Sequence, residues 1–183
     1  MAKVYQFMGN GFEDIEAVAV VDILRRGGID IKTVSVTGSE YVQTAHGMTL
    51  KTDMMFEESD FSDADLLMLP GGMAPGAASL NEHEGLTSLI VEHYNRGGKI
   101  AAICAAPFIF GRLGLLRGKR ATCYPGFETY LEGAEYTAAP VTVDGNIITG
   151  KGPGATLIYA LEILRQLTDA TNADKVAKAM CYI

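Results

Sequence analysis

The chain has 183 residues, which suffices for one α/β domain with a buried core, so we predict a single domain over residues 1–183. Its content of 48% hydrophobic and 20% charged residues is that of a globular protein and excludes extensive disorder. The net charge of −7 argues against a nucleic-acid partner, because phosphate binding depends on clustered Lys and Arg.

Targeting and cysteine patterns indicate the cellular setting. The N-terminus lacks the charged, apolar and small-residue regions of a secretory signal, and no apolar stretch approaches the roughly 18 residues of a membrane span. We therefore predict a cytoplasmic protein with no membrane partner. Cys104, Cys123 and Cys181 fit neither a disulfide framework nor paired zinc ligands, which predicts reduced thiols.

Apolar runs of strand length alternate with segments of helical period along the whole chain. This alternation predicts an α/β fold with a mostly parallel sheet and helices on both of its faces. In chain order, the pattern predicts a strand at 4–8, a helix at 13–26, a strand at 31–36, a hairpin of 41–43 and 48–51, a strand at 66–69, a helix at 81–95, a strand at 99–103, a helix from 107, a hairpin of 141–143 and 146–149, and helices at 156–167 and 174–180.

Cys104 is the first candidate for chemistry, because ligands of open parallel sheets bind beyond the carboxyl ends of the strands. It follows the apolar strand at 99–103 and precedes two alanines and a helix, as at a nucleophile elbow, although the G-x-S-x-G motif is absent. The free N–H groups at a helix start favour a thiolate. The alternative interpretation is a small buried core residue.

Glu16 is the second candidate, because a helical projection places it beside Val20 and Ile23 on the apolar side of its helix. One interpretation is an acid in the first turn, stabilised by the helix dipole. The other is a carboxyl group directed into the crevice. If it meets a Cys104 thiolate there, two like charges are costly, so we predict that Glu16 holds a proton and donates a hydrogen bond to the sulfur.

Backbone donors are predicted beside the sulfur. Gly71 and Gly72 follow an apolar strand and present N–H groups without side-chain obstruction, and with the N–H of Ala105 they could form an oxyanion hole. The alternative is an ordinary Pro-Gly-Gly turn.

No cofactor or metal is predicted. The segment 9–14 has two glycines of a dinucleotide-binding motif but an acid in place of the third, and 145–151 has Gly152 where a phosphate-binding loop needs Ser or Thr. His46, His83 and His93 show no metal-ligand spacing and are predicted to lie at the surface.

Several segments together resemble the ThiJ/PfpI family, which includes the parkinsonism-associated protein deglycase and lies within the class I glutamine amidotransferase-like superfamily. The blocks occur in the family's order and cover nearly the whole chain: Gly11-Phe12-Glu13-Asp14-Ile15-Glu16, Arg25-Arg26-Gly27-Gly28-Ile29, Leu69-Pro70-Gly71-Gly72, Ala101-Ala102-Ile103-Cys104-Ala105 and Gly152-Pro153-Gly154-Ala155.

The resemblance implies a flavodoxin-like three-layer sandwich that usually forms a homodimer. It also implies that Cys104 is the family's reactive cysteine, that Glu16 is its protonated partner, and that Gly72 and Ala105 supply backbone donors. Members of the family have cofactor-free glyoxalase or deglycase activity on reactive dicarbonyls, as well as chaperone and oxidative-stress roles.

One departure from the family concerns Tyr124, which stands where close relatives of the deglycase branch carry a His. A phenol forms hydrogen bonds but is a poor general base at neutral pH. The peptidase branch fits less well, because its His directly after the cysteine is replaced by Ala105.

Three functions follow as hypotheses. The first is attack of a Cys104 thiolate on a small reactive carbonyl, with Glu16 moving protons and Tyr124 as a further site residue. The second is a non-enzymatic sensor or chaperone-like dimer in which Cys104 is oxidised. The third is hydrolysis or hydration of another small substrate, because the fold hosts many chemistries.

Overall fold

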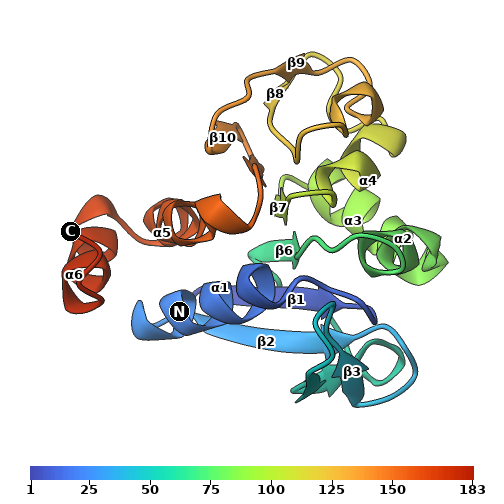
Figure 1. The fold of residues 1–183 in the computed structure, drawn as a ribbon, viewed down its shortest axis with the longest axis horizontal. Coiled ribbons are helices and arrows are strands. Elements are labelled where there is room, and N and C mark those ends of the chain that lie inside the picture. Colours follow the sequence, from blue (N-terminus) through green and yellow to red (C-terminus); the bar gives the residue numbers. More distant parts are fainter.

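A seven-stranded sheet forms the centre of the computed structural model, which describes residues 1–183 (Figure 1). Its order is β10-β11-β7-β6-β1-β2-β5, and every neighbouring pair is parallel except β10 and β11. The strands are β1 (Lys3–Met8), β2 (Asp30–Ser35), β5 (Met54–Met55), β6 (Leu66–Leu69), β7 (Lys99–Ile103), β10 (Val141–Asp144) and β11 (Ile147–Gly150).

Helices cover both faces of the sheet, which confirms the predicted flavodoxin-like sandwich (Figure 1). One face carries α1 (Asp14–Arg26), α5 (Thr156–Leu167) and α6 (Ala170–Ala179), and the other carries α2 (Gly76–Glu82), α3 (Glu84–Asn95) and α4 (Pro107–Arg112). None of these helices is long and apolar enough to cross a membrane.

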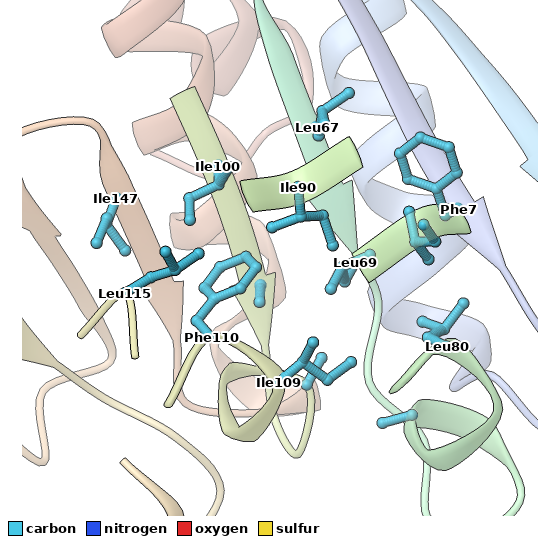
Figure 2. Packing of buried hydrophobic residues seen from close by; sticks show 14 of the residues in the cluster. Phe7, Leu67, Leu69, Leu80, Ile90, Ile100, Ile109, Phe110, Leu115 and Ile147 are labelled. Atoms are coloured by element: carbon cyan, nitrogen blue, oxygen red, sulfur yellow. The ribbon is translucent and has the colours of Figure 1, made fainter. Parts of the chain in front are cut away.

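Two apolar cores lie on the two faces, because successive side chains of a strand point to opposite sides. In β1, Tyr5 and Phe7 join the core under α2, α3 and α4, whereas Val4 joins the core under α1 and α5. Figure 2 shows Ile90 and Phe110 of the helices packed over the strands in the first of these cores. The central strands are therefore apolar on both sides, and the two cores fix the positions of the residues at the strand ends.

The hairpin of β10 and β11 confirms the sequence prediction, and Gly145 adopts a positive φ of 59° in its turn. The predicted pairing of β3 (Tyr41–Gln43) with β4 (Thr49–Lys51) is confirmed as well. The hairpin is why residues 145–151 do not form a phosphate-binding loop.

Some predicted boundaries are wrong. The helix expected at 81–95 is two helices, because the His83 side chain accepts a hydrogen bond from Leu86 N and caps α3. The last helix starts before residue 174, because Asp169 caps it by accepting from Asn172 N. The short elements that were not predicted are α2, β5, the pair β8 (Arg120–Ala121) and β9 (Glu135–Tyr136), and the single turns η1 (Phe56–Glu58), η2 (Glu128–Tyr130) and η3 (Pro153–Ala155).

The prediction that all three histidines lie at the surface is wrong for His93, which is buried and donates a hydrogen bond from Nε2 to the Lys99 carbonyl at 3.0 Å. His83 is half-buried against the Phe56 ring, and only His46 is well exposed. His93 serves packing at the start of β7.

Candidate active site

Cys104 occupies the turn between β7 and α4 with a left-handed φ of 64°, a conformation that non-glycine residues rarely adopt. Its N–H donates to the Gly150 carbonyl at 2.9 Å, and its carbonyl accepts from Tyr124 N at 2.8 Å. Hydrogen bonds on both sides therefore hold the strained backbone. Cys104 is only 5% exposed, with Ala105 buried beside it. This is the predicted elbow geometry, although α4 has only six residues and the individual amides matter more than a helix dipole.

Glu16 lies in the first turn of α1, and its side chain is completely buried. The helix starts there because the Glu13 carboxylate accepts a hydrogen bond from Glu16 N at 2.8 Å. The Glu16 carboxyl group accepts from Gly71 N at 2.9 Å through Oε2. Both sequence interpretations therefore hold in part, since the residue is a first-turn acid that also points toward the ends of the strands.

Gly71 brings Glu16 and Cys104 together. A Cβ atom at Gly71 would lie 2.4 Å from Glu16 Oε2 and 2.5 Å from Cys104 Cβ, both far inside contact distance. The chain after β6 therefore packs against both side chains at once, and it does so only without a side chain of its own. Gly72 has a φ of 124°, and a Cβ there would lie 2.3 Å from the Gly11 carbonyl oxygen. The Pro-Gly-Gly segment is more than an ordinary turn.

Glu16 and Cys104 compete for protons in this space. Burial raises the pKa of Glu16 to about 7, while the neighbouring Cys104 thiol and the hydrogen bond from Gly71 N act in the opposite direction. Burial, followed by the Glu16 charge, raises the pKa of the Cys104 thiol, whereas the amides of Ala105 and Gly72 lower it. Because the Glu16 charge opposes thiol ionisation, a Cys104 thiolate requires a protonated Glu16.

Tyr124 is joined to the site through its backbone rather than its phenol. Its side chain is 42% exposed and lies beside Gly152, lining a separate cavity of about 560 Å³ with Pro153 and Tyr182. No hydrogen bond joins its hydroxyl to Cys104 or Glu16. The phenol is therefore not placed as a base for the thiol in this structure.

Other polar groups were not identified from the sequence. The Gln6 and Tyr159 side chains are fully buried and carry oxygens without a hydrogen-bond partner in the chain, and Tyr159 is close enough for the Glu16 charge to raise the pKa of its phenol. In the sequence, only a glutamine within an apolar strand could have indicated these groups.

Glu13, Asp14 and His46 also offer ligand atoms within 4.8 Å of one another. Their spacing along the chain does not predict this cluster.

Comparison with known proteins matches the DJ-1/PfpI family model to residues 2–166. The chain belongs to the DJ-1/PfpI family. It is 38% identical over 177 residues to DJ-1 homolog B of Arabidopsis thaliana and 36% identical over 175 residues to DJ-1alpha of Drosophila melanogaster, covering 96% and 94% of this chain. A protein named deglycase from Pyrococcus horikoshii is 31% identical, with 90% of this chain and 99% of the relative covered.

Relatives differ in length, and solved structures share the whole fold. The chain spans 40% of the Arabidopsis homolog B and 80% of the Drosophila protein. A cysteine-to-alanine mutant of a DJ-1 superfamily protein from Salmonella typhimurium superimposes with a TM-score of 0.95 at 32% identity, covering 100% of both chains. Oxidized DJ-1 of Toxoplasma gondii gives 0.94 at 32% identity, covering 99% of this chain and 98% of that one.

The role of Gly71 is testable by adding one methyl group. Gly71→Ala should lower the free energy of unfolding by about 1–3 kcal/mol and slow alkylation of Cys104, because the new atom pushes Glu16 and Cys104 apart. Urea unfolding and timed iodoacetamide labelling measure the two effects. Gly154→Ala is the matched control, because a Cβ there meets no atom within 4 Å. Equal stability and equal labelling rates of the two variants would contradict the proposed role of Gly71.

The raised pKa of Glu16 gives stability a defined pH dependence. Its ordinary value is 4.5 and its folded value about 7, so the folded state holds an extra proton between these values and loses stability as pH rises through them. Glu16→Gln removes this titration. Relative to wild type, the variant should gain stability between pH 4.5 and 7, on the order of 3 kcal/mol. Parallel pH profiles from urea unfolding would show that Glu16 is charged when folded.

Proposed function

We propose that this protein is a cofactor-free, cysteine-dependent enzyme that acts on small reactive dicarbonyl compounds by glyoxalase or deglycase chemistry. The observation that supports it most directly is that the Cys104 and Glu16 side chains come together against Gly71. Relatives named deglycase in three archaea support the same class of reaction.

The first step is addition of the sulfur to the aldehyde carbon of the substrate. The S–C bond forms as the carbonyl π pair moves to oxygen, where the amides of Gly72 and Ala105 stabilise the negative charge. Glu16 then gives its proton to that oxygen, which leaves a neutral hemithioacetal and a Glu16 carboxylate. The carboxylate then takes the proton from the former aldehyde carbon and returns it to the neighbouring carbon, which converts the hemithioacetal into the thioester of a 2-hydroxy acid. Water attacks the thioester carbonyl, the S–C bond breaks, and the 2-hydroxy acid leaves while Cys104 recovers its sulfur. A buried acid with a pKa near 7 suits both directions of transfer.

Methylglyoxal turnover tests this function. Cys104→Ala should lower kcat/KM by at least about 100-fold, because the nucleophile is lost. Cys123→Ala is the matched control: its thiol is also buried, and burial raises its pKa to about 12, so it should keep wild-type activity. Lactate formation measures the rate. Wild type no faster than the Cys104 variant would remove the proposal.

A second function is redox sensing, which the half-exposed position of Tyr124 favours because its phenol lies beside Gly152 and does not serve as a second base for the thiol. Cys104 would be oxidised to a sulfenic and then a sulfinic acid by an added peroxide, with Glu16 donating a hydrogen bond to the product.

Peroxide treatment separates this function from general thiol damage. Mild treatment followed by peptide mass measurement should find the added oxygen at Cys104 and not at buried Cys123, and Glu16→Gln should change the product distribution. Modification spread equally over Cys104, Cys123 and exposed Cys181 would count against a sensor.

The assembly and location stay predictions. A homodimer is expected from the family, and Ile15 and Val18 leave an exposed apolar strip on α1 that a second copy would cover. Light scattering of the purified protein measures its mass, and a monomer would contradict this expectation. A cytoplasmic location, the absence of nucleic-acid and membrane partners, and hydrolysis or hydration as another alternative rest on the sequence alone.

A further inference from the structure

A cavity of about 660 Å³ is lined by Ala105, the residue that follows the candidate nucleophile, although Cys104 itself does not line it. Gly72 and Ala105, whose amides lower the pKa of the Cys104 thiol, both line it. Its volume lies in the range typical of small-molecule sites. When a carbonyl oxygen is bound at these two amides, a group attached to that carbonyl can therefore extend into the cavity.

One wall of the cavity is aromatic. Phe108, Phe127 and Tyr130 line it, with ring centroids 5.8–6.5 Å apart and the rings tilted or edge-on to one another. Ala77 and Ala78 of α2 also line the cavity and leave room because their side chains are small. Aromatic rings prefer such tilted and edge-on neighbours, so the wall offers a favourable place for one more ring.

Charges near the cavity disfavour an anionic occupant. Glu82, Glu132 and Arg112 line it, which gives two negative charges and one positive charge. Arg112 forms no ion pair with either carboxylate. An uncharged ring avoids repulsion by the two carboxylates and loses less hydration on entering than a charged one.

We propose that this cavity is a specificity site for the uncharged aromatic substituent of a ketoaldehyde whose aldehyde carbon reacts with Cys104. The inference rests on the proposed function and adds the substrate class. In R–CO–CHO, the group R lies in the cavity while the aldehyde oxygen meets the amides of Gly72 and Ala105. The bond changes are those of the proposed reaction, and water supplies the oxygen of the final 2-hydroxy acid.

Turnover of phenylglyoxal and methylglyoxal by wild type and Ala78→Phe tests the site. The added phenyl ring fills the cavity, so the ratio of kcat/KM for phenylglyoxal to kcat/KM for methylglyoxal should fall at least about fivefold. Ala170→Phe is the matched control, because Ala170 is exposed at the start of α6 and lines none of the cavities described. An equal fall for both substrates, or no fall for either, would overturn the proposal.

A binding measurement keeps the inference independent of turnover and of the folding of Ala78→Phe. Acetophenone, which carries the ring without the aldehyde, should slow alkylation of Cys104 by iodoacetamide in wild type and less so in Tyr130→Ala, whereas benzoate should have little effect. Protection that is absent, or as strong with benzoate, would overturn the proposal. Protection without turnover of either ketoaldehyde would contradict the proposed enzyme and still support the aromatic site.

Discussion

The site depends on two buried acids that share one small space and, between them, one proton. Glu16 and Cys104 meet only because Gly71 has no side chain to keep them apart, and burial makes ionisation of both groups costly. A charge on Glu16 raises the pKa of the thiol, so the state with a reactive sulfur is the one in which Glu16 is neutral. The amides of Gly72 and Ala105 are then the groups that stabilise the thiolate. In the proposed mechanism, the reactivity of the sulfur is therefore a property of the pair rather than of the cysteine alone.

The parallel sheet makes this pairing possible. The chain leaves β6 and β7 at the same edge, and α1 begins beyond the end of β1 beside them, so residues separated by up to 88 positions along the chain meet there. The two apolar cores hold the strands from both sides. The strained Cys104 backbone is held by its hydrogen bond to the Gly150 carbonyl and by the one that it accepts from Tyr124 N. The left-handed φ of Cys104 is thus maintained by the surrounding fold. The chain belongs to the DJ-1/PfpI family, and solved structures of relatives share the same framework with TM-scores of 0.94 and 0.95.

Much of the fold was predictable because long segments carry strong periodic patterns. The apolar run before Cys104, the hairpin turn at Asp144-Gly145 and the amphipathic helix α5 each agree with the sequence prediction. The short elements were not predictable, because two-residue strands such as β8 and β9 exist only through contacts with distant partners. Two boundaries moved because of caps: His83, inside the helix predicted at 81–95, caps α3, and Asp169, ahead of the helix predicted at 174–180, caps α6. For the site, an acid on an apolar helix face identified Glu16, but no sequence pattern shows that the Tyr124 side chain turns toward Gly152 or that three separate segments enclose a cavity.

The state of the sulfur decides between a reactive site and an inert buried thiol. The pKa of Cys104 is measured from the pH dependence of its alkylation in a Cys123→Ser, Cys181→Ser background, where no other thiol reports. Glu16→Gln is predicted to lower this midpoint, because burial and then the Glu16 charge raise the pKa of the thiol, and without that charge the two backbone amides oppose burial alone. A midpoint that Glu16→Gln leaves unchanged would show that burial alone sets the state of the sulfur and would contradict the account.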